Sequence, residues 1–513
     1  MEAETNKPTT RARTEKDVSK PVVDRTAHEP SDKITSAGLE DDSTTNPEPF
    51  SVFTNGQKRW INWLASFGAM FSTLNSYIYF PAVIPIARDL NVSVAMVNLT
   101  ITCYLVVAGI MPAVMGDLAD HEGRRPAYII MCALTVGANV GLALQRSYPA
   151  LFVLRMVQAA GSSGAFGAAH GVVSDISPVA ERGSFTGTVI LFTNTAPSFG
   201  PIISGALAET IGWQWIFWLL TILTAAYSVA VVLFFPETQR KLVGNGSRRV
   251  HGILYRNFFS TVTSHRHVID KATAPSRPKH HIPNPLACLP MLGYKNNLHL
   301  VLFSSITYSL RMTLQASLGS QCPGIYKLNF LQAGLIFLPP GVAGAVAAKL
   351  QGVLIDRNYK RMREQLDGAE FQRGEDISDF PIEKARLKSA TVMVAVTVAA
   401  TVGYGVALMT RAHISVMLIM QFVTSYTTGS VFSITNTLLT DLNPTRAATV
   451  RGASNLVRCL VAGGCIAALE PVTERIGLGW CFGVYAVLQA LVVPLIWRLE
   501  TKGLQWREEQ AAR

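Results

Sequence analysis

The sequence predicts an all-α membrane protein whose twelve transmembrane helices form two six-helix repeats. Apolar stretches of about 20 residues recur along the chain, the length needed to cross a bilayer core of ~30 Å. Of the 513 residues, 49% are hydrophobic and only 15% are charged; ordinary soluble proteins have roughly a quarter charged residues. A charged segment, GDLADHEGRRP at 116–126, lies between two apolar stretches, and a weaker copy, GVLIDRN at 352–358, lies between two later ones. Such a duplicated bundle is typical of a transporter rather than of a soluble enzyme.

Twelve apolar segments are candidate membrane spans. They are 60–82, 94–115, 126–145, 150–172, 184–207, 213–235, 298–319, 330–352, 389–409, 414–437, 447–470 and 477–498. Two depart from a simple apolar helix, because Arg311 and Gln315 interrupt the seventh and Pro339–Pro340 interrupts the eighth. Neighbouring membrane helices can satisfy the carbonyls that a proline frees, so we expect a kink in the eighth span.

The polar segments divide the chain into five regions. They are a disordered cytosolic tail (1–57), an N-terminal six-helix half (58–235), a cytosolic central loop (236–296), a C-terminal six-helix half (297–498) and a cytosolic tail (499–513). The first region has no periodic apolar face, which favours disorder. It also lacks the early apolar segment of a cleavable signal peptide, so we expect the first span to remain as a membrane helix.

The distribution of Lys and Arg predicts the orientation. With the N-terminus inside, few basic residues fall in outer loops, namely Arg88, Arg146, Lys327, Arg411 and Arg475. The inner loops carry many more, and this bias places both termini in the cytosol. We expect a multi-pass protein of the plasma membrane. The net charge of +11 is a topology signal, and because its charges are scattered over loops, no nucleic-acid partner is expected.

Neither a metal site nor an enzymatic site is indicated. The seven cysteines show no CxxC spacing, and the five histidines of the central loop are irregularly spaced. A phosphate loop and a Ser/His/Asp set are absent, which argues against an ATP-driven pump. We therefore expect no cofactor. The expected partners are the lipid bilayer, a small-molecule substrate and, as a candidate coupling ion, the proton, acting on a monomer.

Spacing supports the internal repeat. Asp120 and Asp356 are offset by 236 residues, and Asp175 and Asp441 by 266. The difference fits the longer inner loop at 353–389. Tandem six-helix halves are a known transporter architecture, with the substrate site near the midplane between the halves.

Several segments match one family in order. The 116–126 loop resembles the signature loop of the major facilitator superfamily, Gly-x-Leu-x-Asp-Arg-x-Gly-Arg-Arg/Lys. LRMVQAAGSSG at 154–164 resembles its fourth-helix motif, and APSFGPIISG at 196–205 its fifth-helix antiporter motif. GWQWIFW at 212–218 and FPETQRKLVGNGS at 235–247 resemble the ends of the sixth helix in fungal twelve-helix drug:proton antiporters. The resemblance covers about residues 58–500 and is greatest to the branch with quinidine-resistance and citrate-export proteins.

The resemblance implies a gate at the signature loop. Gly116 and Gly123 would allow a tight turn between helices, and Asp120 could accept hydrogen bonds at a helix N-terminus. Arg124 and Arg125 could pair with Asp175, closing the inner face in one state and separating in the other. The second copy adds Asp356 and Arg357. The alternative is that these residues only set topology.

Two further features bear on the gate and on exchange. His121 stands where the family usually has Arg, which makes the latch weaker, sensitive to pH near neutrality, or simply neutral in effect. Gly200, Pro201 and Gly205 form the antiporter motif in the outer half of the fifth span. Glycine permits close helix approach and proline bends the axis. The family implies a role in exchange, and a packing kink is the alternative.

Three arginines fall within predicted spans: Arg155, Arg311 and Arg458. Intramembrane charge is costly, so we expect these side chains to face the central cavity. No acidic residue is expected deep in a span, which favours an anionic or neutral substrate. The candidate substrate-binding residues are Arg155, Arg311, Arg458, Asn75, Tyr77 and Gln158. Alternatively, each arginine bonds helix carbonyls or polar neighbours such as Gln158 and Asn455.

The function predicted from these features is secondary active transport by alternating access. The chain would export a small organic molecule, either an organic anion or a fungal secondary metabolite. A proton-coupled multidrug or cation efflux antiporter is the near alternative. A membrane sensor that keeps the fold without transporting is the alternative from another class.

Overall fold

The computed structural model describes residues 50–178, 181–246, 248, 253–255, 286, 288–366, 381–443 and 446–511. Most of the predicted N-terminal tail lies outside these residues. So do most of the predicted central loop and its five histidines.

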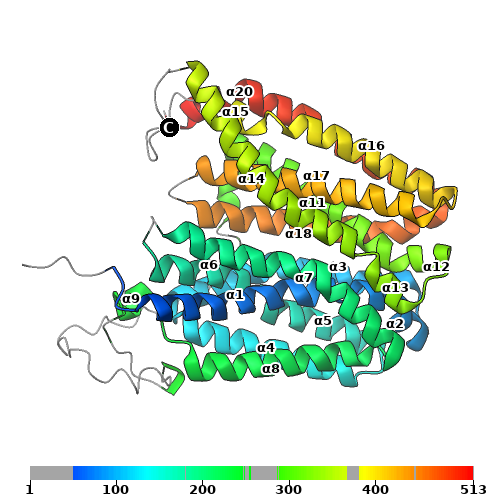
Figure 1. Cartoon of the computed structure of the whole chain (residues 1–513), viewed down its shortest axis with the longest axis horizontal. Coiled ribbons are helices and arrows are strands. Elements are labelled where there is room, and N and C mark those ends of the chain that lie inside the picture. Colours follow the sequence, from blue (N-terminus) through cyan, green and yellow to red (C-terminus); the bar gives the residue numbers. More distant parts are fainter. Residues whose placement is uncertain are drawn as a thin grey trace, which may run out of the picture. The chain divides into compact units, whose positions relative to one another are not determined.

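Within the described residues, twelve helical rods pack together, several of them in two segments (Figure 1). We call the first six the N half: α1 (Asn55–Tyr77) with η1 (Phe80–Ala82) and α2 (Val83–Asp89), α3 (Val94–His121), α4 (Arg124–Leu144), α5 (Tyr148–Ser162) with α6 (Ala165–Ile176), α7 (Arg182–Thr210) and α8 (Gln214–Phe234). We call the last six the C half: α11 (Lys295–Ser320) with α12 (Cys322–Tyr326), α13 (Phe330–Leu335) with α14 (Leu338–Leu366), α15 (Ile382–Leu387) with α16 (Ala390–Met409), α17 (Ile414–Asp441), α18 (Ala447–Ile476), and α19 (Leu478–Ala490) with α20 (Val493–Ala511). The predicted fold class is confirmed.

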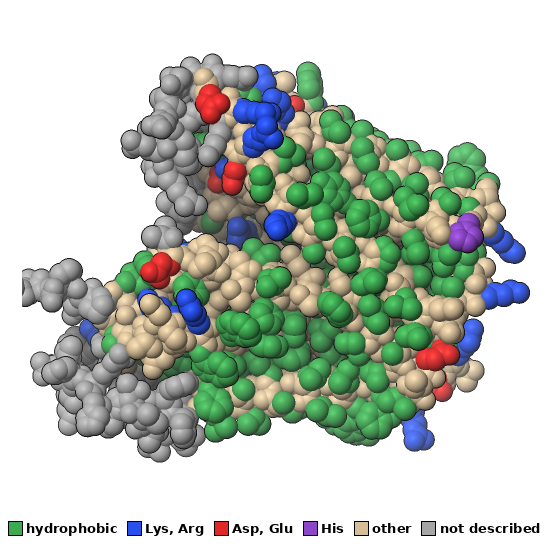
Figure 2. Space-filling model, in the orientation of Figure 1, with side chains coloured by type: hydrophobic (Ala, Val, Ile, Leu, Met, Phe, Trp, Pro, Cys, Tyr) green, Lys and Arg blue, Asp and Glu red, His purple; other side chains and the backbone are tan. Residues whose placement is uncertain are grey.

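The surface of this bundle is suited to lipid. Eight of the described helices are long and apolar enough to cross a membrane, judged by length and composition. Large apolar side chains such as Leu191 (66% exposed) and Val353 (67% exposed) point outward. Figure 2 shows hydrophobic side chains spread over the middle of the visible face, with charged side chains gathered at the two ends. Because a soluble surface would not carry so large an apolar area, this belt is where lipid contacts the protein.

The eighth span is interrupted next to its two prolines. α13 ends at Leu335, and α14 begins at Leu338, so Pro339 and Pro340 lie in the first turn of α14. The first N–H groups of a helix have no partner within the helix, so a proline there loses no hydrogen bond. The expected departure from a straight helix is therefore present at the prolines, as a two-residue interruption between α13 and α14 within one span, Phe330–Tyr359. By contrast, α11 runs unbroken through Arg311 and Gln315.

The first span begins earlier than expected. Thr54 accepts a hydrogen bond from the backbone N–H of Gln57, and the Gln57 side chain accepts one from the N–H of Thr54. This reciprocal capping starts α1 at Asn55, inside the region predicted to be disordered. At the other end of the chain, α20 continues through most of the predicted tail to Ala511.

Contacts between the halves are confined to part of the bundle. We call the end with Asp120 and Arg124 the motif end and the opposite end the far end; they lie at the left and right of Figure 1. Among the described residues, the hydrogen bonds between halves run from mid-helix to the far end. For example, Asn455 Nδ2 donates to the Ala108 carbonyl (3.1 Å), and Thr102 Oγ1 donates to the Gly463 carbonyl (3.0 Å). Figure 2 shows the surface hollowed between the halves at the motif end. The bundle is therefore closed at the far end and open at the motif end.

Candidate functional site

The predicted gate loop lies at the motif end of the N half. Gly123 has φ = +104°, a left-handed conformation that favours glycine, and it joins α3 to α4. The Arg124 guanidinium lies between two carboxylates: Nη1 is 2.6 Å from Asp120 Oδ1, and Nε is 3.0 Å from Asp175 Oδ2. The side chains of Arg124 and Asp175 are only 10% and 9% exposed, so solvent screens this pair weakly. The predicted Arg124–Asp175 pair is confirmed, and it ties α3, α4 and α6 together.

Three expectations about this loop are wrong. Asp120 lies in the last turn of α3 rather than at a helix N-terminus. Gly116 lies inside α3 with open space where a side chain would be, so no tight turn requires it. Arg125 does not pair with Asp175, because its guanidinium donates to the last carbonyls of α8, those of Val231, Val232 and Phe235. A cation at a helix C-terminus is favoured by the helix dipole.

The carboxylate at the N-terminus of α4 belongs to Glu237, which follows α8 and is 8% exposed. Its Oε1 accepts the backbone N–H groups of Arg124, Thr238 and Gln239, each at 2.9 Å. Its Oε2 accepts the N–H of Arg125 at 3.1 Å. Burial raises the pKa of the Glu237 carboxyl, and these N–H donors act in the opposite direction. Glu237 therefore fixes the start of α4, and with it the gate arginine.

Sequence reasoning missed the role of Glu237. The available signal was the acidic residue in FPETQRKLVGNGS, directly after an apolar helix. Nothing local, however, says that this residue meets a loop 113 residues earlier in the chain.

The C half has a matching cluster built with a different arginine. Arg386 of α15 places its Nε 3.1 Å from Asp441 Oδ2 and its Nη1 3.5 Å from Asp356 Oδ1. Asp356 and Asp441 thus occupy the places of Asp120 and Asp175, as the repeat spacing suggests. Arg357, the arginine expected here, is exposed instead. Sequence reasoning missed Arg386 because it follows the longer loop of the C half.

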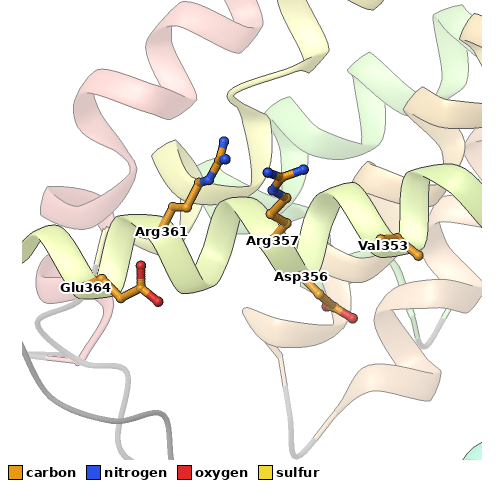
Figure 3. Close-up of a pocket in the computed structure, with 5 residues that line it drawn as sticks. All are labelled: Val353, Asp356, Arg357, Arg361 and Glu364. Carbon is orange, nitrogen blue, oxygen red and sulfur yellow. The ribbon is translucent and has the colours of Figure 1, made fainter.

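The surface around Arg357 is open. Figure 3 shows Arg357 and Arg361 pointing to one side of α14 and Asp356 and Glu364 to the other. They border a shallow hollow of about 510 Å³ together with Val353. Arg357 is therefore free to meet solvent or lipid headgroups and takes no part in the Arg386 cluster.

Arg155 is enclosed by its own half. Its side chain is 1% exposed, and its Cζ lies 4.0 Å from the ring centre of Tyr79 and 4.4 Å from that of Tyr104. Its Nη1 donates to Gln158 Oε1 and to the Asn75 carbonyl. This structure therefore favours the structural alternative for Arg155, a cation held between aromatic rings and amides.

The candidates Gln158 and Asn75 complete the same buried network. Gln158 Nε2 donates to Asn75 Oδ1 (3.2 Å) and to Asn139 Oδ1 (2.6 Å). Tyr77 is also buried, with its ring against Phe80. In this conformation these three side chains pack within the protein rather than facing an open cavity.

Arg311 and Arg458 in the C half are less enclosed. Both side chains are partly exposed, and among the described residues neither lies within 4.0 Å of a carboxylate oxygen. Arg458 donates to Asn455 Oδ1 (2.7 Å), as the structural alternative expected, and its Cζ lies 4.3 Å from the Tyr308 ring centre. Arg311 lies against α14 and α17, where Gly344 and Gly429 leave space for its guanidinium.

The antiporter motif contributes to two close contacts. A methyl group added at Gly200 would lie 2.9 Å from Leu74 Cδ1, so α7 and α1 approach closely there. A methyl group added at Gly205 would lie 3.1 Å from the Cα of Gly334, on α13 of the other half. Pro201, inside α7, faces the same glycine through its carbonyl. The motif therefore forms part of the far-end seam between the halves, where small residues let backbones meet.

Twelve membrane helices in two matching halves, with a paired gate cluster and a cleft open at one end, define a secondary transporter. The family profile described as Major Facilitator Superfamily matches residues 65–468. The chain belongs to this superfamily, which consists of transporters and not enzymes.

Named relatives agree. The chain is 38% identical to the MFS-type transporter phiD of a fungal species (strain ATCC 74256), over 91% of this chain and 72% of that one. It is 31% identical to citrate exporter 1 of Aspergillus niger, over 93% and 91% of the two chains. The crystal structure of a D-xylose–proton symporter shares the fold, with a TM-score of 0.60 at 14% identity, covering 85% of this chain and 97% of that one. The predicted multi-pass secondary transporter of small organic molecules is confirmed.

Glu237→Gln should loosen the start of α4. Glutamine at this position keeps one acceptor oxygen, but its NH₂ group would face a backbone N–H group and could not accept from it. The negative charge of the carboxylate is also lost. Losing charge-assisted hydrogen bonds should cost about 1.5–3 kcal/mol, seen as a lower unfolding temperature of the purified protein. Glu122→Gln, at an exposed position of the same loop, is the control. Equal unfolding temperatures for the two variants would contradict the role of Glu237.

Arg124→Ala or Asp120→Asn should cripple transport while leaving surface expression largely intact, because the cluster that joins α3, α4 and α6 is lost. The measurement is flux at equal protein level in intact cells. Arg357→Ala, the control, removes an exposed arginine of the second copy that takes no part in the Arg386 cluster, and it should transport normally. Normal flux in both gate variants would show that the cluster only sets topology.

Gly205→Leu should abolish transport without unfolding either half, because a large side chain would hold α7 away from α13. Overpacking of a close seam typically costs about 1–3 kcal/mol. Gly200→Leu acts within the N half and should lower the unfolding temperature as well. Gly187→Leu, on the same helix with open space around it, should change neither property. A fully active Gly205→Leu variant would mean that the seam need not close.

Proposed function

We propose that this protein exports a small organic anion from the cytosol by alternating access. The observation that carries the proposal is Arg311. Its Nε is buried without a hydrogen-bond partner, and among the described residues its guanidinium has no acidic partner. An uncompensated arginine at membrane depth costs roughly 2.5–3.5 kcal/mol on insertion scales. A carboxylate of the substrate would offset this cost.

Arg458 supports the same site from α18. Tyr308 lies one turn from Arg311 on α11, and its ring stacks against the Arg458 guanidinium. Phe432 of α17 lies on the same guanidinium, at 5.1 Å from Cζ to ring centre. Like that of Arg311, the Nε of Arg458 is buried without a partner. The two arginines therefore flank one tyrosine, and both have unused donors for an anion.

Direction and membrane are part of the proposal. The excess of Lys and Arg at the motif end supports a cytosolic motif end with both termini in the cytosol. The open cleft of this conformation would then receive substrate from the cytosol. We place the protein in the plasma membrane as a monomer, because export from the cell requires that membrane and each gate cluster lies within one chain. The Aspergillus niger relative is named as a citrate exporter, and that name supports an anionic substrate class.

The test uses purified protein in liposomes, with labelled citrate as the anionic probe and labelled tetraphenylphosphonium as the cationic probe. Wild type should carry the anion. Arg311→Lys and Arg458→Lys keep the charge but lose the planar fork of donors, so the anion KM should rise about tenfold or more. Arg155→Lys should lower protein stability instead, because its partners are internal. Arg475→Lys, an exposed far-end change, is the matched control. Transport of the cation but not the anion, unchanged in both variants, would favour cation efflux instead.

A further inference from the structure

We infer that Glu470 of α18 is a proton-binding site in the far-end seam, and that a proton on its carboxyl allows the halves to close there. The inference deepens the proposed function by naming a coupling ion and its residue. It rests on the proposed function only for the alternation between two states, not for the identity of the substrate.

Glu470 lies where the halves meet. Its Oε1 is 3.5 Å from Nδ2 of Asn98, which belongs to α3 in the N half. Ser320 and Gln321 at the end of α11 lie against the same carboxyl. From the sequence, Glu470 was expected near the outer end of its span and not deep within it. It lies six residues from the end of α18, and the sequence does not show that α3 packs against it.

Two residues beside this carboxyl each have a buried polar atom without a hydrogen-bond partner. Asn98 is 1% exposed, and its Oδ1 has no hydrogen-bond partner among the described residues. The hydroxyl of Ser320 is likewise buried without a partner of good geometry. Buried polar groups are almost always satisfied, so these atoms indicate a missing proton or ligand. In this arrangement the Asn98 NH₂ group faces Glu470. If the Asn98 amide turned over, its oxygen would take that place, and a protonated Glu470 could donate to it and still accept from Ser320.

The surroundings disfavour an ionised Glu470 while the seam is closed. Among the described residues, no Lys, Arg or His lies within 4.0 Å of this carboxyl. The titratable groups that face it are Glu474, one turn along its own helix, and the Cys481 thiol of α19. α3 and α11 present the neutral side chains described above. Glu470 is half-buried. Withdrawing a carboxylate from water is costly and the Glu474 carboxylate adds repulsion, whereas the donors of Ser320, Gln321 and Asn98 act in the opposite direction.

The direction of the pH effect follows. The closed seam favours the protonated carboxyl, whereas opening the far end hydrates Glu470 and favours the carboxylate. A proton from water on the far side binds one carboxylate oxygen when the far end is open, and no other bond changes. Low pH should therefore favour the far-closed state seen here, and high pH the far-open state.

Glu209, in the same seam, differs from Glu470 because its ionised form is the one that supports closure. Its Oε2 accepts the backbone N–H of Phe330 across the halves at 2.8 Å, and its side chain is exposed. An ionised carboxylate is the better acceptor there. Glu209 therefore supports closure when ionised, so it cannot account for closure that requires a bound proton.

The experiment measures the far-end distance directly, without substrate. Spin labels are placed on the exposed far-end positions of the N and C halves by Arg146→Cys and Arg475→Cys, in a Cys465→Ser background because the other cysteines are buried. Pulsed electron–electron double resonance then reports the distance between the two spin labels in full-length protein in nanodiscs between pH 5 and 9. Wild type should shift from a short to a long separation as pH rises.

Glu470→Gln mimics the protonated carboxyl and should keep the short separation at every pH. Glu474→Gln, one turn away and exposed, should still shift as wild type does. Glu209→Gln should also shift with pH, but at a lower midpoint, because it weakens an acceptor that supports closure. Glu470→Asp keeps a titratable group, so a shift at an altered midpoint is expected. A wild-type distance that does not depend on pH, or a Glu470→Gln variant that shifts as wild type does, would overturn the inference. Since no substrate is added, neither outcome depends on whether the cargo is an anion.

Discussion

The contact of Gly205 with Gly334 is the constraint on which the rest of this structure depends. Neither residue has a side chain, so α7 and α13 meet backbone to backbone at the far end. Phe80 and Phe337 stack across the halves beside them, with ring centres 6.1 Å apart. In this conformation the seam is closed at the far end while the motif end is open. The partial burial of Glu470 between α3 and α11 belongs to the same closed seam.

The gate clusters act within each half and not between the halves. Arg124 joins α3, α4 and α6, and Arg386 joins α14, α15 and α17. With the motif end open, each cluster is intact in its own half. The clusters therefore set the shape of each half at this end, which determines the surfaces available when the motif end closes. Glu237 adds a second constraint in the N half, because its carboxylate holds the N-terminus of α4 on which Arg124 stands.

How much the sequence could predict depended on the range of each interaction. Helix number, the repeat and the Arg124–Asp175 pair follow from periodicity and from motifs within short segments. Glu237 and Arg386 were missed because each meets partners that are far along the chain, and no local pattern specifies them. The break before α14 was expected as a kink, since the sequence shows the prolines but not where the preceding helix ends. Arg155 was assigned to the cavity because its residue type is costly in a membrane. Its enclosure by Tyr79 and Tyr104 depends on packing alone.

The enclosure of Arg155 has a consequence for how such transporters diversify. Its aromatic contacts and the hydrogen bonds of its Nη1 all come from the N half, and only its Nε is left without a partner there. Under the proposed function, recognition then depends on α11, α14, α17 and α18, which hold or surround the more exposed Arg311 and Arg458. Gene duplication followed by substitutions in those four helices could change the cargo without disturbing the other six-helix unit. Selection for a new metabolite would therefore favour substitutions after residue 295 more than before it.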